Sequence, residues 1–465
     1  MSTGGTLQKM LTRREAIKTT AIAGVALAAL PGSLAQANRA AFVRAADGGL
    51  ANLSQEELAR QILADPTLRD VHTMAQNLLS GGLNAGKGYP ATWIRDMNTF
   101  INVAIEVNPP APFRDAILMF FKFQGSNGDI IDCYIARNPA EAKVRNRISP
   151  LAPGFVASKN TVESDQESSL VQAVFKYVNA TQDKTLLDER VAGVAVRERL
   201  GQALQYVLSE RFDLKHGLVW GGTTADWGDV QPETPKGVLL DASSHRALSI
   251  YDNAMLVIAI DNYLQLLGDD AHTTAHWKTV RDDLRKNIRK HLWDAKNQKF
   301  IPHVYLAGSP FPKDFDENTI YFHGGTAVAI EAGLLSRREV AHALARMEED
   351  VRLSGAPSIG LTLYPPYPEG FFKNPSMRLP YHYQNGGDWS WFGGRMIQQL
   401  VKYGFIAEAY RNLQPMVERV KRAGDFHEWW SRDNQPRGSA HFRGSAGVLG
   451  QAIEMLQNWA KKATG

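Results

Sequence analysis

Apolar residues recur every three or four positions along most of the chain, which is the spacing of one buried face of an α-helix. This spacing predicts helices over residues 170–177, 191–208, 254–267, 340–347, 396–409 and 448–459. Two further helix starts are predicted by capping boxes, in which a serine and a glutamate three residues later satisfy the first-turn amides. These are Ser54 with Glu57 and Ser336 with Glu339. Alternating strand patterns are few and short, so the pattern predicts an all-α fold.

One motif occurs twice, each time after a predicted helix. In residues 211–219 and 292–301 an aromatic residue precedes an aspartate, Asp213 or Asp294, and a short turn leads to an apolar pair. A repeated helix-turn unit is typical of stacked helical hairpins that share one core. It favours an (α/α)6 toroid over a plain bundle. Because no low-complexity linker interrupts residues 38–465, we expect them to form a single domain.

The first 37 residues have the layout of an export signal. The pair Arg13-Arg14 precedes an apolar run over residues 19–30, and a small-x-small cleavage site ends at Ala37. The run is shorter than the roughly 20 apolar residues that span a bilayer. Paired arginines favour the twin-arginine route. We therefore expect a signal peptide over residues 1–37, a periplasmic or secreted mature chain, and no stable membrane anchor after cleavage.

Charge and composition restrict the partners. The formal net charge is +4, and four basic residues and one acidic residue within positions 1–37 supply +3 of it. A nearly neutral mature chain gives no electrostatic reason to expect nucleic-acid binding. The single cysteine, Cys133, excludes an intrachain disulfide and is expected to be a buried structural thiol. Zinc and phosphate-loop motifs are missing from the sequence, so we expect neither a metal nor an organic cofactor. The sequence does not indicate the oligomeric state.

Tryptophan, glycine and carboxylates gather in residues 92–96, 161–167, 220–229, 387–391 and 424–430, which hold seven of the ten tryptophans. Aromatic rings pack on the apolar face of a sugar, while carboxylates and arginine bind its hydroxyls. The combination therefore predicts a carbohydrate site. Glycoside hydrolysis needs one carboxyl group to protonate the leaving oxygen and another across the anomeric carbon. These segments hold too many acids for spacing alone to select the pair.

The segment Tyr-His-Tyr-Gln-Asn-Gly-Gly-Asp-Trp, which ends at Trp389, resembles the Tyr-His-Asn-Gly-Gly-Ser-Trp signature of neutral/alkaline invertases. The glucosidase domain of glycogen-debranching enzymes has a similar motif. Further segments resemble these families in the same order along the chain, at residues 93–96, 165–183, 252–254 and 428–453. The chain is thus similar to six-hairpin glycoside hydrolases over most of its mature length. The resemblance implies an (α/α)6 toroid, hydrolysis of an α-glucoside or a related hexoside, and no organic cofactor.

The resemblance also implies roles for individual residues. Asp165 corresponds to the general acid and Glu428 to the general base of an inverting mechanism, in which Glu428 activates a water. Asp165 would then need a raised pKa, from burial or from Glu163 and Glu167. Glu167 is an alternative acid, because it lies two residues further along the same helix start. The candidate substrate-binding residues are Trp93, Arg95, Asp96, Glu167, Trp227, Asp229, Tyr383, Asn385, Gly386, Asp388, Trp389 and Trp429.

Structural roles are open for the same residues. A carboxylate at a helix start, such as Asp165, commonly caps the helix. Glu428 suits a buried ion pair with Arg432 or Arg437.

Three other functions also stay open. A polysaccharide lyase would use a tyrosine or histidine base, for which Tyr381, His382 and Tyr383 are candidates. A sugar epimerase would use a histidine pair such as His245 and His382. A non-catalytic carbohydrate-binding protein of the periplasm would need only the sugar contacts.

Overall fold

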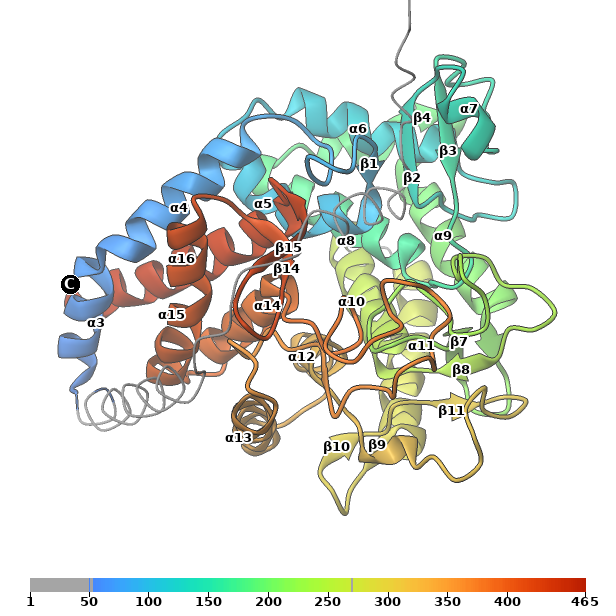
Figure 1. The fold of residues 1–465 in the computed structure, drawn as a ribbon. Helices are drawn as coiled ribbons and strands as arrows, with labels where there is room; N and C mark the ends of the chain where they lie inside the picture. Colours follow the sequence, from blue (N-terminus) through green and yellow to red (C-terminus); the bar gives the residue numbers. More distant parts are fainter. Residues whose placement is uncertain (1–49, 51–52, 269–270) are drawn as a thin grey trace, which may run out of the picture.

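The chain folds as an (α/α)6 toroid, whose computed structural model describes residues 50, 53–268 and 271–465 (Figure 1). Each of six inner helices packs against the next, and the last of them closes the ring on the first. They are α5 (Ile94–Glu106), α8 (Gln166–Thr181), α10 (Ile250–Leu267), α12 (His323–Glu331), α14 (Ser390–Lys402) and α16 (Arg443–Thr464). The predicted export signal, residues 1–37, and the predicted domain start at residue 38 lie outside the described residues.

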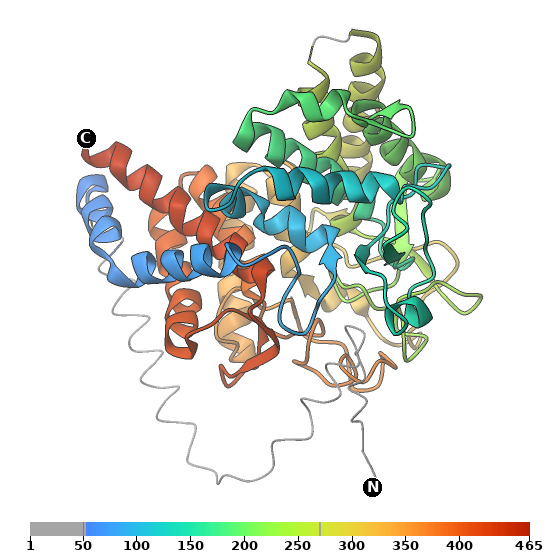
Figure 2. The ribbon, with the colours of Figure 1, turned by 90° about the horizontal axis from the view of Figure 1, so that it is seen from above.

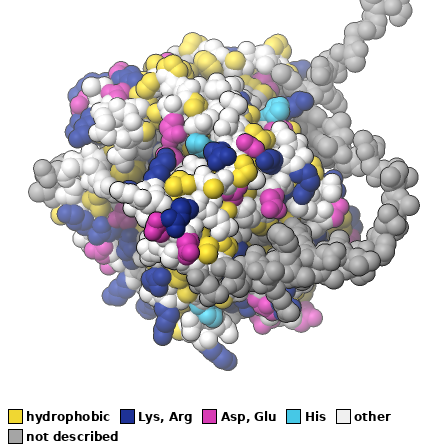
Figure 3. Space-filling view, turned by 90° about the vertical axis from the view of Figure 1, so that its left-hand side faces the viewer, with side chains coloured by type: hydrophobic (Ala, Val, Ile, Leu, Met, Phe, Trp, Pro, Cys, Tyr) yellow, Lys and Arg dark blue, Asp and Glu magenta, His cyan; other side chains and the backbone are white. Residues whose placement is uncertain are grey.

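An outer layer of helices packs against this ring (Figure 2). It comprises α4 (Pro66–Leu79), α6 (Ala111–Lys122), α9 (Val196–Glu210), α11 (Ala271–His291), α13 (Arg337–Ser354) and α15 (Ile406–Ala423), with α3 (Gln55–Ala64) beside α16. Both predicted capping boxes are confirmed, since Ser54 caps α3 with Glu57 and Ser336 caps α13 with Glu339. Among the described helices, none combines the length and apolarity of a membrane span. On the face drawn in Figure 3, basic and acidic side chains are interspersed.

The repeated aromatic-aspartate motif forms a β-hairpin after an outer helix in both copies. Strand β6 (Phe212–Asp213) pairs with β7 (Leu218–Gly222) after α9, and β9 (Trp293–Asp294) pairs with β10 (Lys299–Phe300) after α11. In each copy the aspartate accepts hydrogen bonds from turn amides: Asp213 from His216 N (2.9 Å), and Asp294 from Lys296 N (3.0 Å) and Asn297 N (3.1 Å). The predicted repeat is therefore real, and its aspartates close turns.

The other strands are short and lie mostly at the starts of inner helices. Strand β1 (Thr92–Trp93) precedes α5, β8 (Arg246–Leu248) precedes α10, and β12 (Tyr321–Phe322) precedes α12. Each of these strands pairs antiparallel with a strand from another connection between helices. The strand pairs thereby help to hold the starts of the inner helices in place. The remaining strands are β2 (Cys133–Ala136), β3 (Phe155–Ser158), β4 (Arg190–Val191), β5 (Val194–Ala195), β11 (Val304–Tyr305), β13 (Leu363–Tyr364), β14 (His427–Trp430) and β15 (Pro436–Ala440).

Two helix predictions were wrong in their bounds. Residues 396–409 do not form one helix, because α14 ends at Lys402 and Gly404 adopts a left-handed φ of 77°. The amide of Phe405 returns to Leu400 O (2.8 Å), which closes the helix end before α15 begins. The helix predicted from residue 191 starts only at Val196, since the preceding residues form the β4–β5 hairpin.

Glycine permits the closest contact in the ring closure. A Cβ on Gly447 of α16 would lie 2.3 Å from Phe100 Cα of α5, so only glycine lets these two helices approach this far. One turn further along, a Cβ on Gly450 would meet Ala75 and Val103 at 3.4 Å, which is ordinary van der Waals contact. The same helix thus carries a strictly required glycine and a replaceable one.

We expect Gly447→Ala to lower the free energy of unfolding by at least about 2 kcal/mol, because the added methyl group forces α16 away from α5. Gly450→Ala is the matched control. It should leave stability unchanged or raise it by up to about 1 kcal/mol, since alanine restricts the unfolded chain. Urea unfolding followed by circular dichroism measures both. Equal effects of the two substitutions would contradict this account of the closure.

Candidate active site

The first turns of three inner helices meet at the buried carboxylate of Asp165. Arg95 in the first turn of α5 donates from Nε to Oδ2 (2.8 Å) and from Nη2 to Oδ1 (3.0 Å). Tyr251 in the first turn of α10 donates its hydroxyl to Oδ2 (2.7 Å). Asp165 occupies the N-cap position of α8, but its side chain makes no cap hydrogen bond. The carboxylate therefore links three helices instead of capping its own.

Glu163 shares the same arginine but is in a different electrostatic situation. Its Oε1 lies 3.2 Å from Arg95 Nη2, and its Oε2 accepts a hydrogen bond from Gln166 (3.0 Å). Burial raises the pKa of Glu163 well above its ordinary value, and the nearby charges of Asp132, Asp165 and Asp229 raise it further against the opposing effect of Arg95. Of the two carboxyl groups that contact Arg95, Glu163 is thus the one whose protonated form burial favours.

Glu167 is buried at the start of α8 in a closed ion pair. Its Oε1 accepts from Lys159 Nζ (2.7 Å) and from the amide of Ile130 (2.8 Å). Lys159 also donates to Ile130 O (2.6 Å). A carboxylate with an ammonium and an amide as donors is stabilised in its charged form.

Glu428 lies on β14, which leads toward α16 on the other side of α5. It is fully buried and accepts hydrogen bonds from Tyr89 Oη (2.6 Å), Ser439 N (2.9 Å) and Tyr383 Oη (3.3 Å). A Cβ on Gly438 would lie 2.4 Å from Glu428 Oε2, and Gly438 has a φ of 71°. Backbone and tyrosines therefore fix this carboxylate closely.

Four predicted substrate-binding residues lie near Arg95 or near Glu428. Trp93 ends β1, and the Tyr89 ring that holds Glu428 packs edge-on against it at 6.5 Å. Asp96 is buried in the first turn of α5, next to Arg95. The rings of Trp429 and Tyr383 pack edge-on at 6.4 Å beside Glu428.

Asp229 joins the predicted loop motif to the acid cluster. Gln384, in the Tyr-His-Tyr-Gln-Asn segment, donates its amide to Asp229 Oδ1 (2.9 Å). The charge of Asp229 also acts on Glu163. The structure thus brings the second and third predicted segments together with the Tyr-His-Tyr-Gln-Asn segment.

Other predicted substrate-binding residues have protein partners that account for them. Trp227 and Trp389 are fully buried, and Trp227 stacks on Phe392 at 4.1 Å while its carbonyl accepts from Arg95. Asn385 bridges the backbone of Tyr367 through both its amide atoms (2.8 and 3.0 Å). These contacts support the loops and helix starts around the site.

Gly386 and Asp388 likewise shape the loop. Gly386 has a left-handed φ of 86°, which a side chain would strain. The carboxylate of Asp388 accepts from Arg419 (2.7 Å) and from the amide and hydroxyl of Ser358 (2.7 and 2.8 Å). Both partners of the Asp388–Arg419 ion pair are buried.

The site predicted from the sequence did not include Tyr89, Tyr251 or Asp226. No sequence signal distinguishes the two tyrosines from the twelve others. Asp226 accepts hydrogen bonds from Gly324 N (2.6 Å) and Gly325 N (2.7 Å) at the start of α12, while burial raises its pKa to about 8. Paired glycines opening an apolar helix are the signal that could have indicated this contact.

The residues of the alternative functions have separate partners. His245 pairs with Glu233 (2.9 Å), whereas His382 packs against Trp429 and has its pKa lowered by burial and then by Arg437. Arg432 lies over the ring of Tyr381 at 4.4 Å. Within the described part of the chain, no group of three or more metal-ligating side chains is placed to hold an ion.

A family model described as amylo-alpha-1,6-glucosidase matches residues 151–435, which is more than half of the chain and includes Glu163, Asp165 and Glu428. The chain belongs to the amylo-alpha-1,6-glucosidase family. It is thus a glycoside hydrolase, as the resemblance implied. No curated protein matches the sequence.

Solved structures agree on the fold of this amylo-alpha-1,6-glucosidase family member. The mannosylglycerate hydrolase of Thermus thermophilus, of family GH63 and in complex with glucose, is similar with a TM-score of 0.58 and 16% identity, over 82% of this chain and 99% of that one. A rhamnosidase from Klebsiella oxytoca with rhamnose bound has a TM-score of 0.55 and 13% identity, over 84% of this chain and 64% of that one. At these identities the likeness confirms the toroid.

We expect Asp388→Asn to lower the free energy of unfolding by about 3 kcal/mol, because it leaves the buried Arg419 guanidinium without its counter-charge. Chemical denaturation measures the loss, and KM of the folded fraction should change little. A stable variant with a raised KM would instead support the substrate contact predicted from the sequence.

Proposed function

We propose that this family member hydrolyses an α-glucoside or a related hexoside with inversion, using a carboxyl group at the start of α8 as acid and Glu428 as base. The observation that carries the proposal is the contrast between two buried carboxyl sites on either side of α5. At one, burial and neighbouring carboxylates keep Glu163 protonated. At the other, two tyrosines and a backbone amide orient Glu428. An inverting glycosidase needs this division between a proton donor and a base that holds water.

Within the α8 cluster we assign the transferred proton to Glu163. Asp165, the acid assigned from the sequence, accepts two hydrogen bonds from Arg95 and one from Tyr251, so both its oxygens are occupied by protein donors. Glu167 is similarly held by Lys159. Asp165 is then the fixed negative charge that holds the proton on Glu163 and positions Arg95.

The substrate class follows from the family and from the residues near the acids. Trp93 and Trp429 offer aromatic faces for a pyranose ring, and Arg95 with Asp96 suits the hydroxyls of the sugar whose bond is cleaved. Two structurally similar enzymes hold glucose and rhamnose, which are both six-carbon sugars. A hexoside is therefore the substrate we infer.

The test compares Glu163→Gln, Asp165→Asn, Glu167→Gln and Glu428→Gln on a panel of α- and β-linked oligosaccharides, with the anomeric protons followed by NMR. We expect the opposite anomer to appear first, and Glu163→Gln and Glu428→Gln to lower kcat/KM by about 10²–10⁴-fold. With a glycosyl fluoride, whose leaving group needs no protonation, Glu163→Gln should recover activity and Glu428→Gln should not.

The pH profile separates the three acids further. Because the pKa of Glu163 is raised above its ordinary value, loss of its proton sets the alkaline limb of the pH profile at higher pH than for a free glutamate. The base must be deprotonated, which sets the acid limb. With the fluoride substrate, which needs no proton from Glu163, that alkaline limb should be missing from the unaltered chain and from Glu163→Gln alike. If the fluoride instead rescues Asp165→Asn or Glu167→Gln, the proton belongs to that residue. If no glycan on the panel is cleaved, the hexoside assignment fails.

We also propose that the protein reaches the periplasm by the twin-arginine route, on the basis of Arg13-Arg14 and the apolar run that follows. Replacing both arginines by lysine keeps the charge but removes the recognition pair. We expect this double variant to accumulate uncleaved in the cytoplasm, as measured by cell fractionation and precursor size. Lys9→Arg is the control, and normal export of the double variant would point to a different route.

A further inference from the structure

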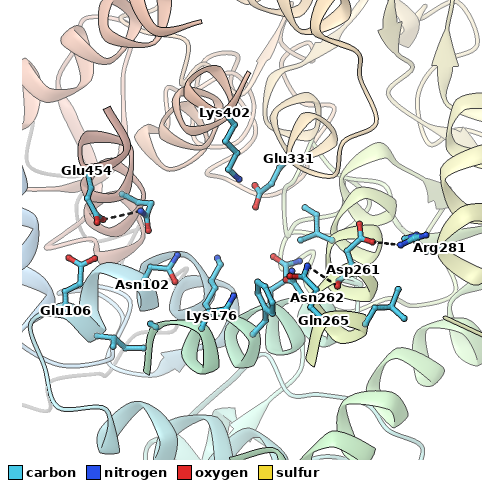
Figure 4. Close-up of a pocket in the computed structure, with 18 of the residues that line it drawn as sticks. Asn102, Glu106, Lys176, Asp261, Asn262, Gln265, Arg281, Glu331, Lys402 and Glu454 are labelled. Atoms are coloured by element: carbon cyan, nitrogen blue, oxygen red, sulfur yellow. Dashed lines mark hydrogen bonds and ion pairs between the residues drawn. The ribbon is translucent and has the colours of Figure 1, made fainter. Parts of the chain in front are cut away.

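A cavity of about 1000 Å³ opens at the opposite end of the toroid from Asp165 and Glu428 (Figure 4). It is lined by the later turns of α5, α8, α10, α12, α14 and α16, together with α11. Helix α5 has 13 residues, and at 1.5 Å of rise per residue it spans about 20 Å. The cavity is therefore separated from the candidate active site by roughly the length of the inner helices.

One side of this cavity carries an excess of positive charge. Glu331, the last residue of α12, forms an ion pair with Arg395 (2.8 Å), and Lys402 and Lys176 also act on its carboxylate. One carboxylate thus partly compensates three cations. Figure 4 labels two of them, Lys402 and Lys176, together with Glu331. Lys176 Nζ donates to the neutral carbonyl of Asn98 (2.6 Å), and burial lowers its pKa to about 8. This side of the cavity therefore favours an anionic group.

Another side carries two carboxyl groups that share a hydrogen bond. Glu106 of α5 and Glu454 of α16 face one another, and burial followed by the charge of Glu454 raises the pKa of Glu106 to about 7. Gln451 donates a hydrogen bond to Glu454 (3.2 Å). Burial lowers the pKa of nearby His72, while the charge of Glu454 raises it and that of Lys461 lowers it. Among the described residues, no arginine or lysine forms an ion pair with either carboxyl group.

Helix dipoles explain only half of this arrangement. The C-terminal end of a helix favours cations, which accounts for Lys402 as the last residue of α14. The same effect disfavours a carboxylate at the end of α5, where Glu106 is the last residue. A second carboxyl group beside Glu106 adds to that cost, which the proton shared by the two groups offsets. An ammonium group that displaced this proton would compensate both carboxylates.

The rest of the lining is made of groups that suit a neutral, polar ligand body. Asp261 is compensated by Arg281 (3.1 Å) and Arg285 (2.7 Å). Several side-chain amides complete the wall and can each donate and accept hydrogen bonds. They are Asn102, Asn179, Asn262 and Gln265.

We propose that this cavity binds a small extended zwitterion, a molecule with an ammonium group at one end and a carboxylate at the other. The carboxylate lies between Lys176 and Lys402, and the ammonium lies against Glu106 and Glu454. Such a ligand compensates both sides at once and adds no net charge to the cavity. A short peptide and an ω-amino acid share this chemistry, and the peptide's amide groups also match the amide wall.

The test measures binding to the full chain by isothermal titration calorimetry, with triglycine and 6-aminohexanoate as zwitterions. Hexanoate and hexylamine are the matched ligands with one charge. We expect a zwitterion to bind at least about ten-fold more tightly than either single-charge analogue, since it gains one more charge-assisted contact. Because an ammonium favours ionised Glu106, binding at pH 7 should also release a fraction of a proton. The dependence of the heat on the ionisation enthalpy of the buffer reports this release.

Variants locate the site. Glu106→Gln and Lys402→Gln should each weaken binding by about ten-fold, and Glu106→Gln should abolish the proton release. Lys421→Gln, which removes a surface partner of Asp70, and Glu428→Gln in the candidate active site should bind as the unaltered chain does. Binding by only one of the two zwitterions identifies the source of the ligand. The proposal is overturned if neither zwitterion binds at millimolar concentration, if the single-charge analogues bind equally well, or if Glu428→Gln abolishes binding.

Discussion

The bidentate ion pair between Arg95 and Asp165 is the interaction on which the candidate active site depends. It joins the starts of α5 and α8, and the hydroxyl of Tyr251 adds α10 to the same carboxylate. All three groups are buried, so their charges act on one another with little screening by water. Removing either charge would leave the other uncompensated in the interior, which makes the pair a strict constraint on the inner ring.

That pair also sets the chemistry of its neighbour. Arg95 directs both its shorter bonds to Asp165 and lies further from Glu163, at 3.2 Å. The two carboxyl groups share one guanidinium, and the charge of Asp165 is among the causes that raise the pKa of Glu163. This is the usual way in which a protein gives neighbouring acids opposite protonation states. The mechanism proposed for this hydrolase rests on that arrangement.

Much of the fold could be predicted from the sequence because its signals are local. Helical periodicity, the two capping boxes and the repeated aromatic-aspartate turn each depend on residues within about one turn or one hairpin of each other. The break at Gly404 was missed because an apolar pattern continues across it, and only the left-handed backbone there reveals the helix end. The toroid itself was inferred correctly from the repeat and the resemblance together.

The site was predicted less completely, because its decisive contacts join distant parts of the chain. Asp165, Glu167 and Glu428 stay predictions for the acid and the base, and Glu163 was not among them. The hydrogen bond that joins Tyr251 to Asp165 spans 86 positions. Trp227 and Trp389 looked like sugar-binding rings in sequence, but burial against other rings uses their faces. Composition identifies which side chains are present, whereas the direction in which a ring faces is decided by packing from several hairpins.

The closure of the ring has a consequence for the order in which the chain folds. Helix α16 follows the other described elements in the chain, and it packs against α3, α4 and α5, which precede them. Tyr89 and Glu428, whose hydrogen bond is 2.6 Å, are likewise joined across most of the chain. Contacts of such long sequence separation form late, because the intervening chain must first be brought together. The ring therefore cannot close until α16 has been made, and the proposed base meets Tyr89 only when the chain brings together residues 339 positions apart.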